Sequence, residues 1–124
     1  MATKNTALRN AMADDFGTLF NSGSIIIRDS SNATLVTFSL HTTAFDAAAE
    51  GVIEAAAASL AEATATGTGT ADNAILQSSD SSMQVTGLTV GTSAAQVLLS
   101  DLAIETDQAV TLTQFSWTEG ATVN

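Results

Sequence analysis

The sequence predicts a mainly β protein: a small antiparallel β-sandwich or barrel with one N-terminal amphipathic helix. Three observations support this fold class. Short runs of alternating apolar and polar residues recur along the chain, and clusters of Gly, Ser, Asn and Asp separate them, as is typical of strands and turns. One helical stripe of large apolar residues precedes these runs. The chain of 124 residues is long enough for one core and too short for two.

Residues 5–21 are expected to form the helix. Asn5 or Thr6 can cap its start, and residues 21–23 supply a stop in which Gly23 is free to take a positive φ. The stripe consists of Leu8, Met12, Phe16, Leu19 and Phe20. Two interpretations stay open: the stripe packs against the sheet of its own domain, or it docks on a neighbouring subunit. These residues are therefore the candidate interface.

A first hairpin is expected directly after the helix. Residues 24–29 form a strand rich in β-branched side chains, residues 30–32 form the turn, and residues 33–40 return. The alternation of the second strand predicts two faces. One face carries Val36, Phe38 and Leu40, and the other carries Leu35, Thr37 and Ser39.

The central hairpin joins residues 71–77 to residues 83–90 through the Ser- and Asp-rich connection 78–82. Alternation in its second strand predicts that Leu88 and Val85 lie on opposite faces. The full predicted faces are Gln84, Thr86, Leu88 and Val90 against Met83, Val85, Gly87 and Thr89.

Residues 46–66 carry two conflicting signals. Their alanines favour a helix, whereas Gly51, the like charges of Glu50 and Glu54 four residues apart, and the lack of a clear apolar stripe oppose one. We expect strand here.

Two later strands are expected. Residues 96–100 form a short strand and residues 109–118 a closing strand, in which Val110 and Leu112 oppose Phe115. The predicted organisation is a helix or arm over residues 1–23, a β-sandwich domain over residues 24–118 and a loose tail over residues 119–124.

Composition excludes several classes of function. Three basic residues against thirteen acidic ones give a net charge of −10, so the chain repels nucleic acid and anionic membranes. The absence of Cys excludes disulfides and thiolate metal sites. The first residues are too polar for a secretory signal, and no apolar run approaches the roughly 18 residues of a membrane span. We expect a protein that folds in a cytoplasm.

No catalytic, cofactor-binding or metal-binding residue is predicted. His41 is the only histidine, so it lacks the partners of a metal site or a catalytic pair. Residues 67–70 are Gly-rich but lack the lysine of a phosphate loop. The acidic groups are Asp14 with Asp15; Asp46, Glu50 and Glu54; and Asp101, Glu105 and Asp107. None has the spacing of a calcium loop. Trp117 is expected in a core or an interface rather than as a sugar platform, and we expect no enzyme.

Four stretches resemble a family of small virion structural proteins of tailed bacteriophages. They are TALRNAMADDFGTLFNSG (residues 6–23) with the Ile-rich strand after it; Thr43-Ala44-Phe45 with Gly51-Val52; the strand–SSDSS–strand hairpin leading into GLTVGTS (residues 87–93); and TLTQFSWT (residues 111–118). The resemblance covers nearly the whole chain, in patterns of helix, strand and glycine.

The resemblance implies a non-enzymatic role in the virion, as a capsid decoration or cement protein on the outer surface of the head. Its partners would be the major capsid protein or another virion protein and further copies of itself, with a trimer favoured. The chain would be made in the host bacterial cytoplasm. Two alternatives stay open: a tail or neck component, and a carbohydrate-binding module of a host-contact fibre.

Overall fold

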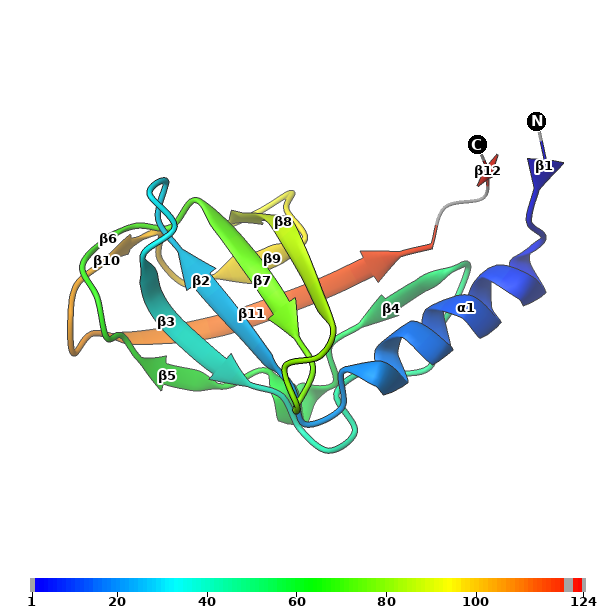
Figure 1. The fold of residues 1–124 in the computed structure, drawn as a ribbon, viewed down its shortest axis with the longest axis horizontal. Coiled ribbons are helices and arrows are strands. Elements are labelled where there is room, and N and C mark those ends of the chain that lie inside the picture. The colour runs from blue at the N-terminus through cyan, green and yellow to red at the C-terminus, as the bar shows by residue number, and fades with distance from the viewer. Residues whose placement is uncertain (1, 120–121, 124) are drawn as a thin grey trace.

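The structure, a computed structural model, describes residues 2–119 and 122–123. About 44% of the chain is strand and 14% is helical, which confirms a mainly β fold. The helix α1 (Thr6–Leu19) lies near the N-terminus and runs beside one end of a curled open sheet (Figure 1). The strands are β1 (Ala2–Thr3), β2 (Ser24–Arg28), β3 (Thr34–Ser39), β4 (Val52–Glu54), β5 (Glu62–Thr64), β6 (Gly69–Thr70), β7 (Asn73–Gln77), β8 (Gln84–Gly91), β9 (Val97–Leu99), β10 (Ala103–Ile104), β11 (Ala109–Thr118) and β12 (Thr122–Val123).

The main sheet has the strand order β3-β2-β7-β8-β9-β11-β4, and β5 also pairs with β11. Two small ribbons, β1 with β12 and β6 with β10, lie outside it. The pairing between strands of this sheet is antiparallel, as expected, except between β8 and β9, which are parallel. The short loop between them brings the chain back beside β8, so that β9 continues in the same direction, and two hydrogen bonds fix this loop. Gln96 N donates to Thr89 Oγ1 at 2.9 Å, and Thr89 N donates to Gln96 Oε1 at 3.1 Å.

The sheet curls until β3, the strand at one end of the sheet order, meets the segment that follows β5. The backbone N–H groups of Thr66 and Gly67 donate to the Leu35 carbonyl at 2.8 and 3.2 Å. An unexpected burial lies at this contact. Val36, Phe38 and Leu40 are buried as predicted, but Leu35, which was expected on the opposite face, is buried as well. The register of β3 against β2 shifts between the pairs Ile27–Val36 and Arg28–Thr34, so Leu35 is the extra residue of a β-bulge, and segment 66–67 lies against it.

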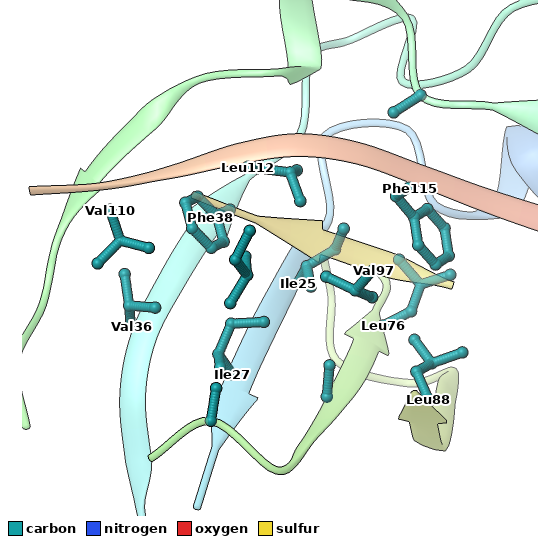
Figure 2. Close-up of a cluster of buried hydrophobic side chains, with 14 of the residues drawn as sticks. Ile25, Ile27, Val36, Phe38, Leu76, Leu88, Val97, Val110, Leu112 and Phe115 are labelled. Carbon is teal, nitrogen blue, oxygen red and sulfur yellow. The ribbon is translucent and has the colours of Figure 1, made fainter. Parts of the chain in front are cut away.

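The core fills the inside of the curl. Figure 2 shows its side chains converging from β2, β3, β7, β8, β9 and β11. The largest fully buried side chains include Phe38, Phe115, Ile25, Ile27, Leu76 and Leu112. These come from strands far apart in sequence, so the core depends on the completed sheet.

Besides the bulge at Leu35 in β3, two further β-bulges change which residues face this core. In β8 the register against β7 shifts between the pairs Ala74–Leu88 and Leu76–Val85, so β8 contains one extra residue there. Val85 and Leu88 consequently both pack on the core, and their predicted opposition is wrong. Gly87, with φ of 75°, supplies the backbone conformation of this bulge.

The second bulge lies in β11. Its register against β9 shifts between Leu112 and Gln114, which inserts Thr113 as the extra residue. Leu112 and Phe115 therefore both point inward, although strict alternation predicted opposite faces. A bulge leaves the strand prediction correct and reverses the assignment of faces beyond it.

Only the N-terminal end of the helix agrees with the prediction. Asn5 caps the start, and its Oδ1 accepts from Leu8 N at 2.9 Å. At the other end Ser22, with φ of 60°, takes the left-handed conformation that was expected of Gly23. Gly23 has a different role, because a Cβ there would overlap the backbone carbonyls of Gln77 and Phe20. Its lack of a side chain lets the chain leave the helix directly against β7.

Residues 46–66 contain strand and no α-helix. β4 and β5 occupy parts of the segment, as expected, but the 3₁₀ turn η1 (Ala57–Ser59) interrupts them. The buried Ser59 fixes this turn: its hydroxyl donates to the Ala44 carbonyl at 3.0 Å and accepts from His41 N at 3.1 Å. Alanines that favour helix in isolation therefore follow the pairing with β11 instead.

The turn of the central hairpin is held by one carboxylate. Asp80 Oδ1 accepts from the Ser82 hydroxyl at 2.7 Å, from Ser82 N at 3.0 Å and from the Ser78 hydroxyl at 2.8 Å. These hydrogen bonds, chiefly those from Ser82, lower the pKa of Asp80 from its ordinary 3.8 to about 2. The charged form is favoured by the folded turn.

We predict that Asp80 stays ionised in the folded protein until the pH approaches about 2. Because its folded pKa lies below the unfolded one, its stabilising contribution is complete above about pH 3.8 and is lost as the pH falls through about 2. A carboxyl carbon NMR titration measures this. Ser82→Ala should raise the midpoint, whereas Ser79→Ala should leave it unchanged. A midpoint near 3.8 in the native protein would contradict the arrangement.

We predict that Gly23→Ala lowers the free energy of unfolding by about 3 kcal/mol, because the new Cβ must displace backbone. Gly87→Ala is the matched control. It has open space around the Cβ and meets only the cost of a positive φ, about 1 kcal/mol. Urea unfolding compares the two variants, and an equal loss in both would rule out close backbone approach as the constraint at Gly23.

Candidate interface

The inner side of α1 is built from small residues. Ala13 and Gly17 are buried, and a Cβ on Gly17 would come within 3.2 Å of Ile53 and Phe45. These residues let the helix lie close to β4 and to the segment before it. Phe20 continues the same side into the core and is only 3% exposed.

Phe16 is the second residue of the predicted stripe that the domain itself covers. Its ring stacks on the Trp117 indole, with 4.4 Å between centroids and 9° between planes, and it contacts Phe20 at 5.0 Å. Such a parallel pair stabilises by about 1 kcal/mol beyond simple burial. Trp117 lies near the end of β11, so this stack joins the helix to the closing strand.

The other three stripe residues stay on the surface. Leu8, Met12 and Leu19 are 48%, 38% and 49% exposed. They fall within about 40° of one another on a helical wheel, whereas Phe16 and Phe20 turn toward the domain. The structure thus divides the predicted interface into a buried part and an exposed part. We call Leu8, Met12 and Leu19 the exposed helix face, and its role in binding stays a prediction.

A network of polar contacts fixes the start of the helix to the end of β11. Glu119 accepts a salt bridge from Lys4 at 2.7 Å, and its carbonyl accepts from Arg9 Nε at 2.9 Å. Glu119 N donates to the Gly51 carbonyl at 2.8 Å, and Gly51 N donates to Asn10 Oδ1 at 2.7 Å. Three segments remote in sequence meet here, and the helix is held at this end as well.

The tail expected to be loose is anchored where the structure describes it. Glu119 belongs to the network above, and Thr122–Val123 pair with Ala2–Thr3 as the β1–β12 ribbon. The remaining tail residues, 120–121 and 124, lie outside the described residues.

A shallow pocket lies beside α1, between the helix and segment 43–47. Its volume is about 220 Å³. Phe45, Ile53 and Gly17 form apolar walls, and Asp14 and Asp46 are among its polar lining residues. We call it the acidic notch. Other polar lining residues are Thr18, Asn21 and Thr43. The sequence placed Asp14 and Asp46 in separate acidic groups, and only the packing of segment 43–47 on the helix brings them to one pocket.

A second hollow, of about 380 Å³, is lined by the loop between β8 and β9 and by the end of β11. Its lining residues are Thr89, Ala94, Ala95, Gln96, Ser116, Trp117 and Thr118. Trp117 Nε1 is buried and has no hydrogen-bond partner among the residues that the structure describes. As expected, Trp117 is a packing residue, since its ring is occupied by Phe16.

The other residues considered as possible catalytic or metal-binding groups do not come together in a site. His41 is exposed, and its Nδ1 accepts from Thr43 N at 3.2 Å. Within residues 2–119 and 122–123, no three His, Cys, Asp or Glu side chains gather as metal ligands would. Over the same residues, no helix has the length and apolarity required to span a bilayer.

Comparison with known proteins adds no relative: no protein-family model, no curated protein and no solved structure matches this chain.

We predict that the two parts of the stripe differ in their effect on stability. Phe20→Ala should lower the free energy of unfolding by about 3–5 kcal/mol, because it empties a core position. Leu19→Ala, on the adjacent position of the helix, should change it by less than about 0.5 kcal/mol. Urea unfolding measures both. A large loss for Leu19→Ala would show that the exposed helix face is covered within the folded monomer.

Proposed function

We propose that this protein is a non-enzymatic structural protein of a bacteriophage virion, a capsid decoration or cement protein that binds the outer surface of the head lattice. The observation that carries the proposal is the exposed helix face, three aliphatic side chains on a helix anchored at both ends. The sequence resemblance to small virion proteins supplies the class of assembly.

Anchoring matters because it lowers the cost of binding. The Glu119 network holds the start of α1, and the Phe16–Trp117 stack holds its second half. An apolar face that is already in its bound position loses little conformational entropy when a partner covers it. On a symmetric shell each copy needs only a modest affinity, since many equivalent contacts act together.

The chemistry of the exposed apolar residues separates this proposal from a carbohydrate-binding module. Sugar sites present aromatic rings to solvent, whereas the exposed large apolar residues of the described chain are aliphatic: Leu8, Met12, Leu19 and Met83. Aliphatic side chains of this kind favour contact with protein. A tail or neck component would use the same contacts at another place in the virion, and the trimer expected from the sequence stays a prediction.

The direct test of the proposal is the position of the protein on purified virions. Mass spectrometry of the particles establishes whether it is a component, and cryo-electron microscopy establishes which surface carries it. Density on the outside of the head is the expected result. Density on the tail or neck would move the proposal to that component, and absence from the particles would overturn it.

We predict that Met12→Ser weakens binding to virions that lack the protein by about tenfold, because a buried methionine contributes about 1.5 kcal/mol or more. Met83→Ser is the matched control: it makes the same chemical change at the same 38% exposure, on the central hairpin. Occupancy after incubation with each purified variant measures the effect. Equal occupancy of the two variants would remove the helix from the binding surface.

A further inference from the structure

We infer that the second hollow, between the loop after β8 and the end of β11, receives an extended, uncharged segment of a different protein, which adds to the sheet as a strand. The inference rests on the proposed function, because the virion shell would supply this segment. The hollow has a volume of about 380 Å³ and is lined in part by Thr89, Gln96 and Thr118. We call it the strand gap.

The strand gap exists because β9 is too short to fill the space between its two neighbours. β9 has three residues, whereas β8 has eight and β11 has ten. Val97, the first residue of β9, pairs with Val90 on one side and with Phe115 on the other. Since β9 is parallel to β8 and antiparallel to β11, an earlier start of β9 would place it between Thr89 and residues 116–118. β8 and β11 are second neighbours, about 9.5 Å apart, which is the room that one strand takes.

The end of β11 directs backbone groups into the strand gap. Ser116 N donates to the Gln96 carbonyl at 3.0 Å, on the side of β9. Glu119 N donates to the Gly51 carbonyl at 2.8 Å, on the side of β4. Backbone groups alternate between the two sides of a strand, so Thr118 directs its N–H and C=O to the side of β9. Within residues 2–119 and 122–123, no strand pairs with Thr118 on that side. The complementary partner of such groups is the backbone of another extended chain.

The opposite wall of the strand gap carries a side chain where a strand would lie. Thr89 N donates to Gln96 Oε1 at 3.1 Å. A side-chain amide presents the same kind of acceptor as a peptide group, so an incoming backbone carbonyl can replace it. The bulge at Gly87 bends β8 and confines the added strand to the part after it, Leu88 and Thr89. Met83, which precedes β8, lies outside this contact.

The lining of the strand gap determines the chemistry of the segment. It contains no charged side chain, although the sequence has thirteen acidic and three basic residues. A charge that entered the gap would be buried without a partner, so the segment is uncharged. β8 also lacks the Lys or Pro that commonly protects an open strand edge. The end strands of the sheet order differ, because β3 and β4 receive backbone hydrogen bonds from segment 66–67 and from Asp46.

A second copy of this chain does not fit as the donor of the segment. The described ends of the chain are already paired with each other, Ala2–Thr3 with Thr122–Val123. The remaining strands are held in the main sheet or in the β6–β10 ribbon. Two copies also repel, since each has a net charge of −10. The donor is therefore a different protein.

Hydrogen exchange tests the backbone contact directly. Exchange of the intact protein, free and bound to purified virions that lack it, is quenched and read by mass spectrometry. We expect the Thr118 amide to exchange about tenfold more slowly in the bound protein, because it gains a backbone acceptor. The Ser79 amide, on the exposed turn of the central hairpin, is the internal control and should keep its rate. Bound protein in which the Thr118 rate is unchanged would overturn the inference.

Two variants at one position separate the backbone of Thr118 from its side chain. Thr118→Pro removes the N–H and obstructs pairing on that side, so we expect occupancy on virions to fall by about tenfold. Thr118→Val keeps the N–H and removes the hydroxyl, and it should keep the native occupancy. Urea unfolding establishes that both variants are folded. Equal occupancy of the two folded variants would overturn the inference, and the exchange of the native chain decides if Thr118→Pro does not fold.

Self-association gives a separate way to fail. If sedimentation equilibrium shows oligomers that Thr118→Pro abolishes and Thr118→Val keeps, a second copy fills the strand gap and the inference is wrong. Failure of the proposed function is distinguishable, because it appears as absence of the native protein from virions. Native protein that occupies virions without protection of the Thr118 amide would overturn this inference alone.

Discussion

The fold depends on the pairing of one long strand, β11, with three partners in succession. Its first residues pair with β5, its middle with β9 and its end with β4. The pairing of β11 with these three strands closes one side of the core. It also places Trp117 and Glu119 against the helix and the residues before it. The placement of α1 is thus a consequence of where β11 ends, and so is the exposure of Leu8, Met12 and Leu19. A change in the register of β11 would alter the core and the helix together.

Much of the fold is present in local sequence signals. Asn5 as cap, the hairpin turns and the bounds of β11 follow from side chains that act on their own backbone. The faces of β8 and β11 do not. Each contains a bulge, and the residue that a bulge adds is determined by the partner strand rather than by the strand itself. Leu35 is a similar case, because the segment that covers it lies about thirty residues further along the chain.

The candidate interface shows the same limit. A helical stripe indicates that apolar residues share a side, but its width leaves open which part meets the domain. The small residues Ala13 and Gly17 decide this, because they permit the closest approach to Ile53 and Phe45. Phe16 and Phe20 then turn inward, and the others remain outside. The sequence signal for the acidic notch was weaker: the polar residues Asp14, Thr18 and Asn21 lie along one edge of the helix. The position of residues 43–47 was needed to recognise the pocket.

The hydrogen bonds from Thr66 and Gly67 to Leu35 have a further consequence, which concerns the rim of the sheet. An uncovered outer strand is a template on which another polypeptide can add by backbone hydrogen bonding. Many copies of one chain at high concentration can aggregate in this way. Here the rim at β3 is occupied by the protein's own backbone. Strand addition at this point is blocked, so association at this part of the rim has to use side chains, whose identity selects the partner.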